Sequence, residues 1–120
     1  IDVSDGLVAD LGHICERSKV AAVVSLERLP RSPLLRRHRE HPAALAAVLG
    51  GGDDYELCFT AAPNRHAAVL RAAASAGTPV TCIGRVLRAP QAAYRVVVVD
   101  RDGLPLAPLR GGFDHFAEPR

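Results

Sequence analysis

Methionine and tryptophan are absent from this 120-residue sequence, and aromatic residues make up only 4% of it. Its core must therefore consist mainly of valine, leucine, isoleucine and alanine. Lysine is almost absent as well, with Lys19 as its single example. Because there is no initiator methionine and the chain opens inside a strand-like stretch, we expect these residues to be a piece of a longer protein.

Long apolar runs are also missing. None approaches the ~20 residues that a membrane helix needs, and the first residues do not resemble a signal peptide. The formal net charge of +2 is too small to favour binding to nucleic acid or to a charged membrane surface. The sequence therefore predicts a protein with no membrane segment and no nucleic-acid partner.

Cysteine is scarce and widely spaced, at Cys15, Cys58 and Cys82. No C-x-x-C pair occurs, and no two histidines have the spacing of zinc ligands. Since all three cysteines lie in apolar, periodic segments, we expect buried thiols in a reducing compartment, which predicts a cytoplasmic protein without structural zinc.

The composition, with 48% hydrophobic and 23% charged residues, is that of one globular domain. Periodicity and turn residues predict alternating helices and strands. The helices are expected from residue 4 or 5 to 18, at 42–49 with Pro42 in the first turn, and at 64–76 with Asn64 as a cap and Gly77 as the stop. The strands are expected at 19–29, 55–60, 80–86 and 94–99. Gly84 indicates a bulge or a close approach, the valine run 96–99 suggests burial on both faces, and Asp102-Gly103 predicts a turn. This order predicts an α/β or α+β protein with a mixed β-sheet flanked by helices on at least one face.

The first seven residues carry two carboxylates and a hydroxyl at the mouth of the first helix: Asp2, Ser4 and Asp5. Ser4 or Asp5 can cap that helix, with side-chain oxygens on free backbone N–H groups. Capping leaves Asp2 unexplained. The alternative is that Asp2 and Asp5 are oxygen ligands of Mg²⁺, which in turn would hold phosphate.

A second unusual stretch follows the helix at 42–49, where Gly50, Gly51 and Gly52 precede Asp53 and Asp54. One glycine is enough to end a helix, so the run favours a close approach of the backbone to a ligand. A flexible turn with solvated acids is the equally open alternative.

Basic residues gather at 31–39, which we interpret as a solvated connecting helix or loop rather than a binding patch, because no aromatics interleave with them. No P-loop, dinucleotide-binding or G-x-S-x-G pattern occurs. Acidic clusters, glycine backbone and a near absence of lysine suit a site where metal neutralises phosphate.

Three motifs together resemble those of thiamine-monophosphate kinases, in the aminoimidazole-ribonucleotide-synthetase-like superfamily. They are Asp2-Val3-Ser4-Asp5-Gly6-Leu7 with Asp10-Leu11, Gly51-Gly52-Asp53-Asp54-Tyr55-Glu56-Leu57, and Gly112-Phe113-Asp114-His115-Phe116. The resemblance covers essentially the whole chain and implies that residues 1–120 are the C-terminal domain of such an enzyme. It also implies that an N-terminal ATP-binding domain lies outside the chain.

The resemblance implies ATP- and Mg²⁺-dependent phosphorylation of thiamine monophosphate to thiamine diphosphate, by an enzyme that is a homodimer at full length. It places Asp2 and Asp5 as Mg²⁺ ligands, Ser4 as an ATP contact, and Asp53 and Phe113 as substrate contacts, and it assigns no certain catalytic residue. The family usually has glutamate where this chain has Asp53, and the shorter side chain puts that contact in question.

Two alternatives stay open at this point. One is another ATP-using enzyme of the same superfamily, and the other is a non-catalytic module that keeps the fold and binds a ligand. The resemblance also implies that these 120 residues fold but have no kinase activity alone.

Overall fold

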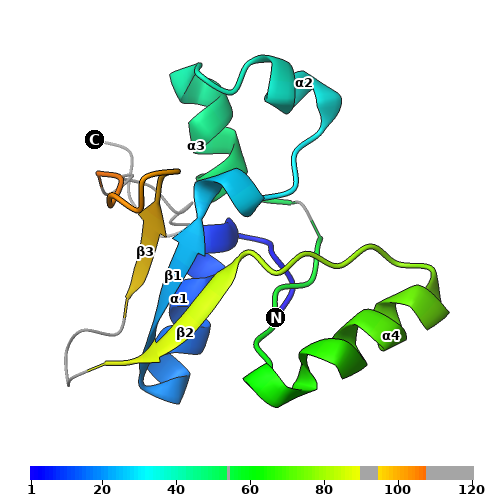
Figure 1. The fold of residues 1–120 in the computed structure, drawn as a ribbon. Helices are drawn as coiled ribbons and strands as arrows, with labels where there is room; N and C mark the ends of the chain where they lie inside the picture. Colours follow the sequence, from blue (N-terminus) through cyan, green and yellow to red (C-terminus); the bar gives the residue numbers. More distant parts are fainter. Residues whose placement is uncertain (54, 90–94, 108–120) are drawn as a thin grey trace.

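A computed structural model describes residues 1–53, 55–89 and 95–107 of the chain. Helices and strands alternate irregularly, as the sequence predicts (Figure 1). The elements in chain order are α1 Leu7–Ser18, β1 Val20–Ser25, η1 Leu26–Arg28, α2 Pro33–Arg37, α3 Pro42–Gly50, η2 Pro63–Arg65, α4 His66–Ala76, β2 Gly84–Arg88 and β3 Val96–Val99.

The sheet is mixed, with the strand order β2-β1-β3. β1 runs antiparallel to β2, with Val20 opposite Arg88, and parallel to β3, with Ala22 opposite Val96. A side chain at Gly84 would collide with the carbonyl oxygen of Val23, so the close approach that the sequence suggests at this glycine is confirmed.

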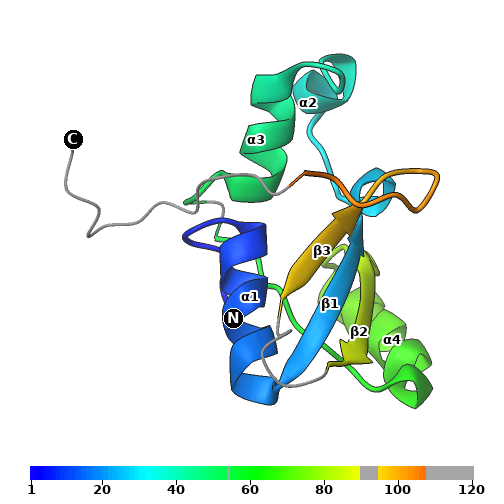
Figure 2. The ribbon, with the colours of Figure 1, turned by 90° about the vertical axis from the view of Figure 1, so that its left-hand side faces the viewer.

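Helix α1 covers one face of this sheet, and the core lies between them (Figure 2). The amphipathic pattern of α1 explains this placement, because its apolar positions recur once per turn. The buried residues that form the core are Val3, Leu11, Cys15, Ala22, Val24, Leu29, Leu49, Cys58 and Val98. The predicted mixed sheet with helical cover is confirmed.

Helix α4 lies on the side of the sheet away from α1 (Figure 2) and has no buried residue. The glycine stop predicted for it is confirmed, because Gly77 has the left-handed φ of 62°. The predicted cap at Asn64 is wrong: a 3₁₀ turn occupies Pro63–Arg65, and the helix itself begins at His66.

Three predictions about these strands, two of position and one of burial, need correction. The first strand stops at Ser25 and continues as a 3₁₀ turn, and the strand expected at 80–86 is shifted to Gly84–Arg88. Only Val98 of the four valines in β3 is buried and the other three are half-buried, so the expected burial on both faces is wrong.

The chain turns back after β3, as predicted at Asp102-Gly103. Asp100 Oδ1 accepts hydrogen bonds from the backbone N–H groups of Asp102 and Leu104, both at 2.9 Å, and Gly103 has φ 78°. The third motif, with Phe113, lies outside the described residues. Within the described residues, no helix has the length and hydropathy that a membrane crossing requires.

Candidate functional site

The first two motifs, fifty residues apart in sequence, lie side by side in the structure. An isolated antiparallel bridge joins Asp2 to Leu57. The backbone hydrogen bonds around it run from Val3 N to Glu56 O (2.7 Å), Tyr55 N to Val3 O (3.0 Å), Cys58 N to Ile1 O (2.9 Å) and Asp53 N to Ser4 O (2.9 Å). This backbone pairing builds the candidate site.

The pairing is irregular, because Tyr55 and Glu56 both bond to Val3. Two residues opposite one is a β-bulge, and in the G1 type the first position is left-handed and usually a glycine. Tyr55 occupies it with φ 53°, and nearby Asp53 has φ 62°. The regular strand predicted at 55–60 is therefore wrong. Strain of this kind is typical of functional sites, where neighbouring contacts hold the backbone in place.

Glycines let the two motifs touch backbone to backbone. A Cβ on Gly52 would lie 2.5 Å from the carbonyl oxygen of Ser4, and one on Gly6 would lie 2.9 Å from the backbone of Gly50. A Cβ on Gly51 would collide with the carbonyl oxygen of Ala47. The glycine run thus serves close packing of the chain on itself, which neither sequence interpretation anticipated.

Asp10 is the buried acid of this site, with 2% of its surface exposed. Its Oδ2 atom accepts hydrogen bonds from the backbone N–H groups of Ser4 (2.9 Å) and Asp5 (3.0 Å). The helix begins after Gly6 with no side-chain cap. The predicted capping by Ser4 or Asp5 is therefore wrong: the acid that binds free N–H groups comes from inside the helix.

Asp10 also belongs to a cluster of three possible metal ligands with Asp5 and His13. One ligand atom from each lies within 4.8 Å of the others. Sequence reasoning missed Asp10 and His13, although their spacing of three on a helix places both side chains on one face. Asp2 lies outside this cluster, opposite Leu57.

Two further predicted site residues, Ser4 and Asp53, are joined to each other by the backbone hydrogen bond from Asp53 N to Ser4 O. Ser4 is half-buried, and Asp53 and Tyr55 are exposed. The hydroxyl of Tyr55 donates a hydrogen bond to Asp53 Oδ1 at 3.3 Å. The structure thus brings Ser4, Asp5 and Asp53 to one place, while Phe113 lies outside the described part of the chain.

Several proteins similar to this chain in sequence are named thiamine-monophosphate kinase. The chain is 42% identical over 119 residues to thiamine-monophosphate kinase of Salmonella typhimurium and 44% identical to that of Escherichia coli. These matches cover 99% of the chain and 35% of either relative's length. The chain is related to the thiamine-monophosphate kinases. No protein-family model matches it.

Solved thiamine-monophosphate kinases have the same fold. A crystal structure of the Stenotrophomonas maltophilia enzyme matches with a TM-score of 0.72 and 48% identity, covering 86% of this chain and 30% of that one. A structure of AaThiL complexed with AMPPCP and TMP matches with a TM-score of 0.68 and 34% identity, covering 97% and 33%. The expected fold family is confirmed.

The resemblance to thiamine-monophosphate kinases implies Mg²⁺, and the donor atoms of the cluster can be tested against it. Magnesium is usually held by one or two carboxylates, while water and substrate phosphate complete its six ligands. Asp5 and Asp10 offer such carboxylate oxygens. The imidazole of His13 is more typical of transition-metal sites. The two carboxylates fit Mg²⁺.

The cysteines differ from one another more than the sequence predicts. Cys15 and Cys58 are buried, as expected, but Cys82, which lies in the segment between α4 and β2, is exposed. Burial raises the pKa of the Cys15 thiol above its ordinary value of 9.0, and the nearby Cys58 adds to this. Burial also raises the pKa of Cys58; the charged N-terminus partly offsets this rise, and Asp10 adds a smaller raising contribution.

We expect Ellman's reagent at pH 8 to modify Cys82 at once, and Cys15 and Cys58 only after denaturation, because the thiolate is the reactive form. The unfolded chain releases its thiol protons at lower pH than the folded one. The free energy of unfolding should therefore fall as the pH rises above about 9. Cys82→Ser should abolish the fast reaction, and two fast thiols in the native protein would contradict the assignment.

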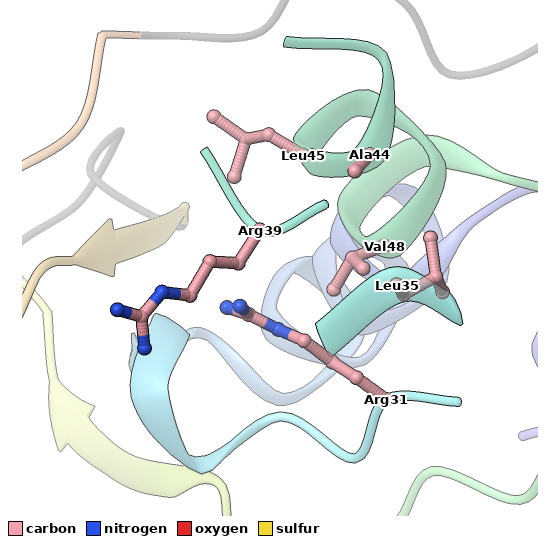
Figure 3. A pocket seen from close by; sticks show the side chains of 6 residues that line it. All are labelled: Arg31, Leu35, Arg39, Ala44, Leu45 and Val48. Carbon is pink, nitrogen blue, oxygen red and sulfur yellow. The ribbon is translucent and has the colours of Figure 1, made fainter. Parts of the chain in front are cut away.

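The basic segment forms the exposed helix α2 and its flanks, as the solvated interpretation predicts. Arg31 and Arg39 line a small hollow beside α3 (Figure 3). The guanidinium of Arg31 donates to the carbonyl oxygen of Leu26 at 2.8 Å, and Arg39 pairs with Glu40 at 3.2 Å. Both guanidinium groups thus have local partners, although Arg31 Nε is buried without a hydrogen-bond partner among the described residues.

Proposed function

We propose that this chain is part of a thiamine-monophosphate kinase that transfers the γ-phosphoryl group of ATP to thiamine monophosphate, giving thiamine diphosphate and ADP. The observation that most directly supports this proposal is the backbone pairing of residues 1–5 with 53–58, which joins the two motifs that resemble that family. The similarity of the whole chain to named kinases supports the same activity.

The chain spans about 35% of the length of its relatives. We propose that residues 1–120 are the C-terminal domain, and that an N-terminal domain supplies the rest of the ATP site. We also propose that the full-length protein is a cytoplasmic homodimer. AMPPCP is an ATP analogue, so the AaThiL complex with AMPPCP and TMP supports the same pair of substrates here.

In this proposal Asp2 and Asp5 hold Mg²⁺, Ser4 contacts ATP, and Asp53 and Phe113 contact the thiamine substrate. Bound Mg²⁺ supplies positive charge for the phosphate oxygens. The residues of this chain act by position: the carboxylates before α1 would hold the metal ion that neutralises the phosphates, and Asp53 on the paired segment reaches the substrate. Positioning and charge stabilisation account for most of the catalysis of phosphoryl transfer.

The test is an assay of the full-length protein with Mg·ATP and thiamine monophosphate, which should yield thiamine diphosphate and ADP in equal amounts. Unphosphorylated thiamine is the control substrate and should not be turned over, because it has no phosphate to accept the new group. The isolated 120-residue chain should be inactive. A full-length protein that binds nucleotide but makes no thiamine diphosphate would refute the proposal.

A further inference from the structure

Asp10 is the one buried charged residue in the described part of the chain, and it lies beside the two residues given roles in ATP and metal binding. Its exposed fraction is 2%, and it forms no ion pair with a basic side chain among the described residues. A buried carboxylate is costly unless other groups compensate for its charge. The groups that compensate for the charge of Asp10 therefore indicate its role.

Two backbone donors and a helix end compensate this charge. Asp10 lies in the first turn of α1, where the free N–H groups of the helix favour an anion. Its Oδ2 atom also takes the N–H groups of Ser4 and Asp5, which come before the helix. In a capping box an acid in the first turn reaches back in the same way, but to the cap residue. Here the bonds go one and two residues beyond the cap, Gly6.

We infer that Asp10 is a positioning residue that holds the Ser4-Asp5 turn in the shape required for metal and nucleotide binding. The inference rests on the proposed function. A single oxygen bonded to two successive N–H groups fixes the orientation of both peptide units, and so fixes where the side chains of Ser4 and Asp5 point. A carboxylate oxygen of Asp10 also lies within 4.8 Å of a ligand atom of Asp5 and of His13.

The test separates this role from simple structural support and from direct metal ligation. Mn²⁺ binding to the full-length protein is followed by electron paramagnetic resonance. The Mn²⁺ site that is lost in Asp5→Ala is the site assigned to Asp5. Asp10→Ala removes the acceptor of both N–H groups and should weaken that site about 10- to 100-fold, as loss of supporting groups around metals does. It should also raise the Mg²⁺ concentration needed for half-maximal activity.

Asp10→Asn is the decisive variant, because its amide oxygen can still accept both N–H groups while its charge is gone. If Asp10 acts by positioning, Asn should bind Mn²⁺ within a few-fold of wild type. Ile14→Val, on the same helix and packed against the core, is the matched control. It should lower the melting temperature slightly and leave Mn²⁺ binding unchanged.

Three results would overturn the inference. If Asp10→Asn bound Mn²⁺ as weakly as Asp10→Ala, the charge of Asp10 or its direct ligation of the metal would matter, and not the shape of the turn. If Asp10→Ala bound Mn²⁺ as tightly as wild type, the Ser4-Asp5 turn would keep its shape without Asp10. A wild-type protein with no Asp5-dependent Mn²⁺ site would leave nothing to position. Because Mn²⁺ binding is measured without turnover, failure of the kinase assay would refute the proposed function and not this inference.

Discussion

Replacing Asp5 by asparagine is expected to lower kcat/KM for thiamine-monophosphate phosphorylation by about 10²- to 10³-fold, the loss typical of removing one group that stabilises transition-state charge. Asp5 belongs to the cluster with Asp10 and His13, and the neutral amide binds Mg²⁺ far more weakly than a carboxylate. Initial rates across a range of Mg²⁺ concentrations measure the effect, and circular dichroism checks that the fold persists.

Asp102→Asn is the matched control for this change. It alters the same functional group at an exposed turn, away from the motifs, and should leave both activity and Mg²⁺ dependence unchanged. If Asp5→Asn retained wild-type kinetics, the first motif would have to be interpreted as structural, and the proposed metal role of Asp5 would be lost.

Replacing Gly6 by alanine is expected to destabilise the protein by roughly 2–6 kcal/mol, the sum of backbone strain and overpacking. Gly6 has φ 112° and ψ 147°, a conformation that residues with a side chain rarely adopt. Its added Cβ would also meet the backbone of Gly50 at 2.9 Å. Urea unfolding measures the loss. Kinase activity should fall with it, because the turn before α1 must move.

Gly12→Ala is the control for Gly6→Ala. Gly12 lies within α1, and a Cβ there would meet no atom within 4 Å. The substitution should stabilise the protein by about 0.5–1 kcal/mol, the gain expected from alanine in a helix. If the Gly6→Ala protein unfolded at the same urea concentration as wild type, this result would contradict the tight contact between the two motifs.

Helix positions were predictable wherever apolar spacing and end signals agreed. The pattern from Leu7 to Cys15 predicts α1, and Pro42 correctly predicts the first turn of α3. The end of α4 follows from Gly77. Each of these signals acts within a few residues, so no knowledge of the rest of the fold is needed.

Local signals failed where a distant partner decides the outcome. Ser4 and Asp5 have the composition of helix caps, but Asp10 takes their N–H groups instead. The alternation at 55–60 is that of a strand, but its partner is a short segment at the start of the chain, and a bulge interrupts the pairing. Cys82 has apolar sequence neighbours, yet it lies in the segment between α4 and β2 and is exposed.

The sequence by itself determined the chemistry available to this protein: acids and glycines in two motifs, few lysines, and the periodicity of its helices. Only the tertiary structure decided that residues 1–5 pair with 53–58 and that Asp10 lies beneath them. The physical reason is that this pairing uses backbone N–H and C=O groups, which every residue except proline carries alike. Side-chain patterns cannot identify such partners, and the glycines between them show only that the backbones come close.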